Sequence, residues 1–385
     1  MRITIVIGAF LPMPPAPTGA IEKVWHKLAE AFAARGHDVT ILCPLHEGAA
    51  RDDRANGVRY LRFARRSRTG STRLDLVKDL AYSWNVWRAL PEADVTVTNC
   101  FWLPVLLRLA RRGRVGALNV HAQRFPKNQF GLYRKADRIS TVSDAIADAI
   151  KTQTPAVASL VKVIPNPVDV SIFRRDGASR RDPSVRRVLF TGRIHPEKGL
   201  DLLVKAAARA RDRVPNIALT LIGPSEVERG GGGARFVEEL RGLAGDTPLT
   251  FGANIADPRE LATALRSCDA YCYPSVAFFG EASPVAPLEA IACGAPTVVS
   301  DLPQFAGYIQ DERTGLVFAR EAPDAVDRLA AQLVRVLSDD TTARRLSEAG
   351  VAKAQELSVE RIAEAHLADF AELVAARSRT RTTRG

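Results

Sequence analysis

The sequence predicts an α/β protein built from two doubly wound units of parallel strands. Short apolar runs of strand length alternate with segments of helical periodicity along the whole chain, which is typical of parallel α/β sheets. A chain of 385 residues is longer than one hydrophobic core usually organises. Its apolar content of 46% supports a globular fold throughout. We therefore predict one domain over residues 1–170 and a second over residues 171–357.

Each half contributes its own set of predicted strands. In the first half these are residues 3–7, 38–42, 58–63, 95–98, 116–121 and 138–142, with a helix over 21–35 that Gly36 ends. In the second half they are residues 187–191, 217–223, 249–251, 270–273 and 296–299. A polar stretch at 173–183 marks the join between the halves. We expect a final amphipathic helix over 358–376 and a frayed basic tail over 377–385.

Several classes of protein are excluded by the apolar segments and the cysteines. No stretch approaches the ~20 apolar residues of a membrane span, and the apolar run at residues 2–7 is too short for a signal peptide. We therefore expect a cytoplasmic location. The five cysteines are scattered, mostly in apolar runs, which predicts reduced core thiols and no metal site; they are Cys43, Cys100, Cys268, Cys272 and Cys293.

The net charge of +11 lies in the first half of the chain. Residues 1–170 carry 25 Lys and Arg against 14 Asp and Glu, whereas the remaining residues are balanced. Two interpretations are open: a solubilising surface, or a basic face for an anionic partner such as the inner surface of the cytoplasmic membrane. The basic clusters are Arg62, Arg65, Arg66, Arg68 and Arg73, then Arg108, Arg111, Arg112 and Arg114. We expect no nucleic-acid partner, because zinc-ligand spacing, an RNA-binding signature and a recognition helix are all missing from the sequence.

Four consecutive glycines, from Gly230 to Gly233, raise the question of a phosphate-binding loop. They lack the GxxxxGK[ST] arrangement of a P-loop, and no GxGxxG follows the first predicted strand. We therefore predict a flexible surface loop here. An ATPase and an ordinary NAD-dependent dehydrogenase are both disfavoured.

The turn from Gly192 to Gly199 predicts a grip for a diphosphate. It places Arg193 and Lys198 five positions apart between the strand at 187–191 and an apolar-periodic helix that starts at Leu200. Cations in a strand-to-helix turn can meet a phosphate. Lys supplies a compact charge and Arg a planar fork, so the pair can hold a pyrophosphate and stabilise it as a leaving group.

Two residues of the first half are further candidates for the site. Gly19 lies between the first strand and its helix, where it would let backbone N–H groups approach a ligand; an ordinary Gly–Pro turn is the alternative. His121 stands at the carboxyl end of a strand, the edge where open α/β sheets bind ligands. Its alternative role is a structural hydrogen bond.

Two glutamates of the second half, Glu281 and Glu289, are eight positions apart. Because Pro284 and Pro287 disfavour a helix before residue 288, we place Glu281 in a loop and Glu289 in the first turn of a helix over 288–293. One carboxylate would accept ribose hydroxyls and the other would face a sugar. Two solvated glutamates are the alternative, but the small apolar residues around them favour a packed site.

Taken together, these motifs resemble the large family-4 retaining glycosyltransferases of the GT-B fold. The resemblance spans nearly the whole chain and rests on residues 17–22, 163–169, 192–199, 273–275 and 281–296. Its most specific part is the GRxxxEKG turn followed by the E-x7-E element. The family's architecture implies two Rossmann-like domains that face an interdomain cleft, with the final helix crossing back to the N-terminal domain. The N-terminal domain would bind the acceptor and the C-terminal domain the donor.

The resemblance also implies roles for single residues. Arg193 and Lys198 would contact the donor diphosphate, Glu289 the ribose, Glu281 the transferred sugar and His121 a sugar hydroxyl. Gly19, Gly192 and Ser283 would belong to the donor-binding surface. This sequence departs from the family at Ala20, where a second Gly is common, at Ser283, where an aromatic or large apolar residue is frequent, and at Val359, where Trp is frequent.

The predicted function is glycosyl transfer with retention and without a metal ion. The donor would be a UDP-sugar, or a GDP-sugar in second place, and the acceptor a glycan, a lipid-linked oligosaccharide or a small molecule. No cofactor is expected: the sequence contains no D-x-D motif, and two cations can replace a metal at the leaving diphosphate. Three alternatives stay open: a sugar-nucleotide epimerase, a phosphorylase on a similar fold, and a non-catalytic sugar-nucleotide-binding module.

Overall fold

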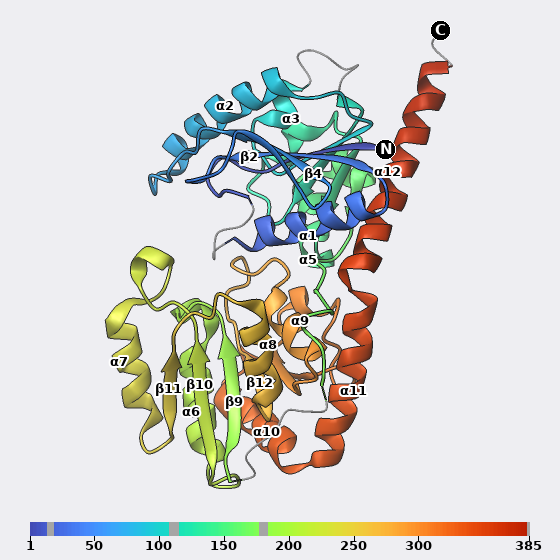
Figure 1. The fold of residues 1–385 in the computed structure, drawn as a ribbon. Helices are drawn as coiled ribbons and strands as arrows, with labels where there is room; N and C mark the ends of the chain where they lie inside the picture. Colours follow the sequence, from blue (N-terminus) through green and yellow to red (C-terminus); the bar gives the residue numbers. More distant parts are fainter. Residues whose placement is uncertain (14–18, 108–114, 177–183, 383–385) are drawn as a thin grey trace. The chain divides into compact units, whose positions relative to one another are not determined.

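The computed structural model describes the chain except for residues 14–18, 108–114, 177–183 and 383–385. Part of the turn before Gly19, the basic cluster at 108–114, most of the predicted join and the end of the predicted tail therefore lie outside the described residues. The chain forms two compact units (Figure 1), one made of Met1–Pro167 with Val359–Gly385 and one made of Val168–Ser358. Both units are doubly wound α/β structures, which confirms the predicted fold class.

Unit 1 contains a sheet of eight strands in the order β3-β4-β2-β1-β5-β6-β7-β8. All neighbours are parallel except β3 and β4. The strands are β1 (Arg2–Val6), β2 (Asp38–Pro44), β3 (Asp52–Ala55), β4 (Val58–Phe63), β5 (Val95–Thr98), β6 (Ala117–Ala122), β7 (Arg138–Thr141) and β8 (Val161–Val163). Its helices are α1 (Ala20–Ala34), α2 (Thr72–Ala89), α3 (Leu103–Leu106), α5 (Asp144–Gln153) and α12 (Val359–Thr382), with 3₁₀ turns η1 (Phe130–Tyr133) and η2 (Pro155–Leu160).

Unit 2 contains a fully parallel sheet of six strands in the order β11-β10-β9-β12-β13-β14. They are β9 (Arg186–Thr191), β10 (Ile217–Ile222), β11 (Leu249–Gly252), β12 (Ala270–Tyr273), β13 (Thr297–Ser300) and β14 (Leu316–Phe318). The helices are α6 (Leu200–Ala210), α7 (Gly233–Ala244), α8 (Pro258–Ser267), α9 (Val285–Ala292), α10 (Ala325–Ser338) and α11 (Asp340–Glu356), with 3₁₀ turns η3 (Pro196–Lys198), η4 (Val227–Arg229) and η5 (Pro303–Phe305). Helix α6 packs against α7 and α10, and α9 packs against α8 and α11.

Both sheets reverse their strand order at the first strand of the unit. Strand β1 lies between β2 and β5, and β9 lies between β10 and β12. In doubly wound sheets the carboxyl end of such a strand opens a crevice that binds ligands. Gly19 follows β1 and Gly192 follows β9. The two turns that the sequence singled out thus lie at the switch point of each sheet.

All eleven predicted strands overlap observed ones, but β3, β8 and β14 were missed. Strand β3 is polar and mostly exposed, so it carries no apolar pattern. It joins β4 through Asn56 and Gly57, whose φ angles of 50° and 79° suit a tight hairpin turn. The Asn-Gly pair is a hairpin signal that the sequence offered.

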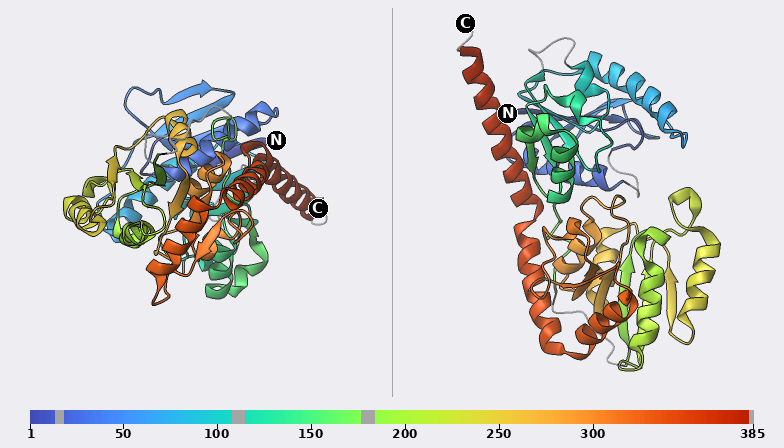
Figure 2. Two further views of the ribbon diagram at one scale, coloured as in Figure 1. Left: turned by 90° about the horizontal axis from the view of Figure 1, so that it is seen from below. Right: turned by 180° about the vertical axis from the view of Figure 1, so that it is seen from behind.

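The final helix is longer than predicted, and a tail that begins at residue 377 is wrong. Helix α12 continues to Thr382. Between Val359 and Thr382 there is no Gly or Pro to end it, and Arg377 is anchored by an ion pair of 2.7 Å to Asp137. The helix packs on α1 and β6 within unit 1 (Figure 2).

Candidate active site

The turn after β9 is shaped by its two glycines and by the strand beside it. Gly192 donates its N–H to the carbonyl of Ile222 at 2.9 Å. Gly199 closes the turn at φ +63°, and a Cβ there would lie 2.2 Å from the carbonyl oxygen of Pro274. Only glycine fits that conformation at such a close approach. The turn therefore fixes Arg193 and Lys198 at the switch point of unit 2.

Lys198 is buried and paired with Glu281. Its Nζ forms a short ion pair with Glu281 Oε1, and the two side chains are 8% and 6% exposed. Nζ also lies 5.2 Å from the ring centroid of Tyr273. The structure thus brings together two site residues that are 83 positions apart in the sequence.

The same oxygen of Glu281 accepts two further hydrogen bonds. Ser275 Oγ lies 2.7 Å from Oε1 and Tyr273 Oη lies 3.1 Å from it. Burial raises the pKa of Tyr273, with the Glu281 carboxylate adding to the effect, so the phenol stays protonated and donates. Tyr273 and Ser275 lie in a segment that carries the family resemblance, but the sequence predicts no role for either side chain.

Arg193 is more exposed than Lys198 and reaches the four-glycine run. Its Nη1 donates to the carbonyl of Gly230 at 2.7 Å, and Nη2 lies 3.4 Å from Glu197 Oε2. About two fifths of the side chain, 39%, stays accessible. The guanidinium is therefore oriented by a backbone carbonyl and still open to a ligand.

The predicted flexible loop at the four-glycine run is wrong. Gly232 donates to the carbonyl of Ile194 and Gly233 to that of Ser225, both at 2.8 Å. Gly231 is buried, and a Cβ there would lie 2.2 Å from the carbonyl carbon of Ser225. The run is glycine-rich because backbone packs against backbone at this point, and it supports the Arg193 turn.

Helix α9 starts three residues earlier than predicted. It begins at Val285, after Pro284 at the N-cap, and ends at Ala292 before Cys293 and Gly294. Pro287 is tolerated because N–H groups of the first helical turn have no partner within the helix. Glu289 consequently lies in the second turn, half-buried, and close enough to Tyr271 to contribute to its raised pKa after burial. Ser283 is buried before the helix.

In unit 1, Gly19 is the N-cap of α1, and a buried carboxylate interacts with two arginines nearby. Gly19 has φ 133°, and Lys23 donates its N–H to the Gly19 carbonyl at 3.1 Å. Glu22 is 7% exposed, and burial raises the pKa of its carboxyl, although the positive charges of Arg124 and Arg68 act to lower it. Burial also lowers the pKa of Arg124. Sequence reasoning missed Arg124, although it follows His121 by three residues at the end of β6.

His121 is enclosed within unit 1 and not open to solvent at the sheet edge. It is 5% exposed, Nδ1 lies 3.0 Å from Ser140 Oγ, and the ring meets Trp25 of α1 edge-on at 4.9 Å. Burial lowers the pKa of His121 to about 3, with the nearby His366 of α12 adding to the shift. Its contact with a sugar hydroxyl stays a prediction.

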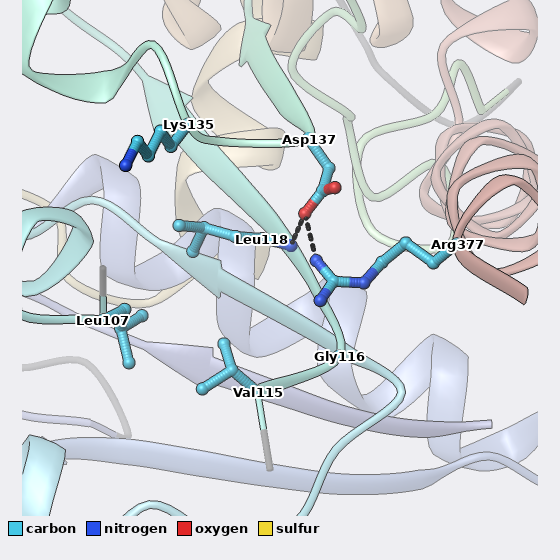
Figure 3. A pocket seen from close by; sticks show the side chains of 7 residues that line it. All are labelled: Leu107, Val115, Gly116, Leu118, Lys135, Asp137 and Arg377. Atoms are coloured by element: carbon cyan, nitrogen blue, oxygen red, sulfur yellow. Dashed lines mark hydrogen bonds and ion pairs between the residues drawn. The ribbon is translucent and has the colours of Figure 1, made fainter. Parts of the chain in front are cut away.

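A separate pocket of about 410 Å³ lies at the opposite edge of the same sheet (Figure 3). It is lined by Gly116 before β6, by Lys135 and Asp137 before β7, and by Arg377 of α12. Asp137 is already paired with Arg377 at 2.7 Å and with the Leu118 N–H at 2.8 Å. This pocket contains none of the predicted site residues.

The described residues offer neither a metal site nor a membrane span. No group of three or more His, Cys, Asp or Glu side chains there is arranged to hold a metal ion. Nor does any helix in that part of the chain have the length and apolar character needed to cross a membrane. The thiols of all five cysteines are buried and unpaired by disulfides.

Two families of known proteins match the two halves of the chain. The family described as "Glycosyl transferases group 1" matches residues 174–353, and the "Glycosyl transferase 4-like domain" matches residues 19–167. The chain is 29% identical over 365 residues to the phosphatidyl-myo-inositol mannosyltransferase of Mycobacterium tuberculosis, covering 89% of this chain and 90% of that protein. It is 32% identical over 250 residues to the D-inositol 3-phosphate glycosyltransferase of Kribbella flavida, covering 61% of this chain and 56% of that protein.

Among solved structures, the sucrose-phosphate synthase from Thermosynechococcus elongatus superposes with a TM-score of 0.81 at 22% identity. The match covers 98% of this chain and 100% of that one, which shows that the fold is shared. Two family matches that cover most of the chain, relatives of similar length and this fold all agree. The chain therefore belongs to the group 1 glycosyl transferases of the GT-B fold and is a glycosyltransferase.

Proposed function

We propose that this enzyme transfers a sugar from a nucleotide-diphospho-sugar to an acceptor hydroxyl, with retention of the anomeric configuration and without a metal ion. The observation that carries the proposal is the turn that fixes Arg193 and Lys198 at the switch point of unit 2, with Glu281 against Lys198. Two cations at one turn suit a leaving diphosphate, whose charge develops as the bond to the sugar breaks.

The proposed reaction follows a front-face route. The bond between the anomeric carbon and the phosphate oxygen breaks while the acceptor oxygen bonds to the same carbon on the same face. The acceptor proton passes to a leaving phosphate oxygen, so no protein carboxylate has to act as a general base. Because the acceptor attacks the anomeric carbon directly, none has to act as a nucleophile either. Arg193 and Lys198 would stabilise the departing diphosphate, Glu281 would face the sugar, and Glu289 would accept the ribose hydroxyls. Gly19, Gly192 and Ser283 would complete the donor surface.

The names of the relatives support an inositol-bearing acceptor. One is a phosphatidyl-myo-inositol mannosyltransferase and others are D-inositol 3-phosphate glycosyltransferases. We therefore propose a hydroxyl of inositol as the acceptor, with mannose as the first sugar to test. For the nucleotide, uridine is our first choice and guanosine the second.

Helix α2 favours a lipid-borne acceptor over a soluble one. Four large apolar side chains on one face of the helix are exposed: Leu74 at 56%, Val77 at 65%, Leu80 at 40% and Trp84 at 48%. Arg73 and Arg88 stand exposed at the two ends of this stripe. An apolar stripe with a Trp and flanking cations suits the interface of an anionic membrane. Phosphatidylinositol presented in a bilayer is therefore the proposed substrate.

The test is a panel of donors followed by a panel of acceptors. A bound donor should raise the melting temperature by mass action, so thermal unfolding with UDP- and GDP-sugars selects the donor. Transfer is then measured to phosphatidylinositol vesicles and to soluble inositol 3-phosphate. Donor-dependent transfer with a retained anomer supports the proposal. Conversion of the donor in the absence of an acceptor would show that the protein is an epimerase. A requirement for inorganic phosphate would show that it is a phosphorylase. Donor binding without any turnover would show that it is a non-catalytic binding module.

A further inference from the structure

One carboxylate oxygen of Glu281 accepts from three different side chains. Oε1 accepts from Lys198, from Ser275 and from Tyr273, which belong to η3, to the loop after β12 and to β12 itself. All four side chains are buried, with Ser275 fully enclosed. Buried charges need several polar partners, because water cannot replace any that leave.

Lys198 is therefore engaged before any donor arrives. If Lys198 turns from Glu281 to the oxygens of a diphosphate, Glu281 is left buried without its cation. An unpaired buried charge is strongly unfavourable. The donor can bind well only if other groups hold Glu281 after Lys198 has left it.

We propose that Tyr273 and Ser275 are positioning residues that hold Glu281 when Lys198 moves to the donor diphosphate. This inference rests on the proposed function. Both hydroxyls are held by their own surroundings. The Tyr273 ring stacks on Phe190 at 5.4 Å, and the Ser275 carbonyl accepts from Ser300 Oγ at 2.6 Å.

The geometry also shows why the two hydroxyls can act alone. Ser275 Oγ has a second acceptor, the Glu197 carbonyl at 3.1 Å, but Glu281 is nearer at 2.7 Å. Tyr273 Oη has Glu281 as its acceptor. Each hydroxyl can thus keep its proton directed at Oε1 while Lys198 leaves. Glu281 stays in place to face the sugar, and Lys198 is free for the phosphates.

Calorimetric titration of the full chain with UDP and with GDP tests this exchange. Ser275→Ala and Tyr273→Phe should each weaken binding of the preferred nucleoside diphosphate by about tenfold to a hundredfold, the worth of a hydrogen bond to a charged group. In the transfer assay the donor KM should rise by a similar factor, with kcat at saturating donor changed by less than about threefold. Tyr271→Phe is the control, because that buried hydroxyl of β12 bonds to Thr191.

A double-mutant cycle shows whether the hydroxyls act through Glu281. In the Glu281→Gln background no carboxylate charge has to be held, so Ser275→Ala should then change nucleotide affinity by less than about twofold. An equal loss in both backgrounds, or no loss in the single variants while thermal unfolding shows them folded, would overturn the inference. If the wild-type chain binds no nucleoside diphosphate, the proposed function fails instead, and the two failures are distinct.

Discussion

At the scale of the residue, the site depends on where charge is placed in a nearly dry environment. Lys198 and Glu281 are both buried, whereas Arg193 keeps 39% of its side chain accessible. The two cations of the turn are therefore not equivalent. Arg193 is partly open to solvent, whereas Lys198 is already paired with a buried carboxylate. His121 is buried as well, but as a neutral imidazole among aromatic rings and not as a charged group with an ionic partner.

Lys198→Ala should lower kcat for transfer by about a hundredfold to a thousandfold, the usual loss when one donor to a developing negative charge is removed. The substitution removes a cation from the leaving diphosphate, and it also leaves the buried Glu281 carboxylate without its cationic partner. Steady-state kinetics with the preferred donor measure it. Lys205→Ala is the matched control, since Lys205 is an exposed lysine of the following helix that pairs with Asp201. Near wild-type turnover in Lys198→Ala would refute the assigned role.

The buried histidines should make unit 1 sensitive to acid. Burial lowers the pKa of His366 to about 4 and that of His121 to about 3, from an ordinary value of 6.5. Between pH 6.5 and about 4 the unfolded chain binds protons that the folded chain does not, so stability falls as pH falls through this range. Each pKa unit is worth about 1.4 kcal/mol.

His366→Phe should flatten this acid dependence, because Phe cannot titrate and suits the neighbouring Phe370 and Trp25. Urea unfolding of wild type and variant from pH 7 to pH 4 measures the difference. His46→Gln, in the loop after β2, is the control. Parallel stability curves for wild type and His366→Phe would contradict the prediction.

At the scale of the element, α12 is held on unit 1 by one buried carboxylate and a row of aromatic contacts. Asp369 is fully buried, pairs with Arg138 at 2.9 Å and with Lys162 at 2.8 Å, and thereby ties the helix to β7 and β8. Phe370 meets Phe32 of α1 at 5.9 Å and His366 meets Trp25 at 5.3 Å. The sequence predicted the helix, but its periodicity could not reveal the anchors.

Asp369→Asn should destabilise the protein by about 2 kcal/mol or more, since it leaves two cations without their buried partner, partly screened by solvent. Chemical denaturation followed by circular dichroism measures the change. Glu372→Gln removes a carboxylate that contacts the same two cations but is 64% exposed, so its effect should stay within about 0.5 kcal/mol. Equal effects of the two variants would show that burial of Asp369 does not matter.

At the scale of the whole molecule, the charge and the apolar stripe occur in the same unit. The excess positive charge belongs to residues 1–170, and α2 exposes its apolar side chains there. A basic face was one of the two interpretations of the charge that the sequence left open. The stripe emerged only from the structure, because α2 also buries Tyr82, Ser83 and Val86 on its other side. When apolar residues occur on both sides of a helix, the sequence pattern does not predict which side faces solvent.

The chain should float with vesicles that contain phosphatidylinositol or phosphatidylserine, and moderate salt should weaken the binding because charge attraction is screened. Val77→Asp should abolish flotation, since it places a negative charge in the middle of the stripe. Leu132→Asp is the control, being an exposed leucine of the same unit outside α2. Flotation that is absent in the wild type, or unchanged in Val77→Asp, would remove the membrane from the proposal.

The sequence by itself determined the two doubly wound units, eleven of the strands and the glycine turns at both switch points. These features follow from local rules: apolar periodicity sets strands and helices, and glycine marks close backbone approach. It missed β3, β8 and β14, which have four residues or fewer, and it set α9 too short because prolines in the first helical turn carry no penalty.

Only the tertiary structure decided which side chains contact one another. It paired Lys198 with Glu281 over 83 positions, enclosed His121 under Trp25, and packed the four glycines onto the Arg193 turn. These outcomes depend on contacts between segments that are distant in the sequence. Residue type states which chemistry a side chain can perform, but burial and neighbours decide which charge is free to perform it.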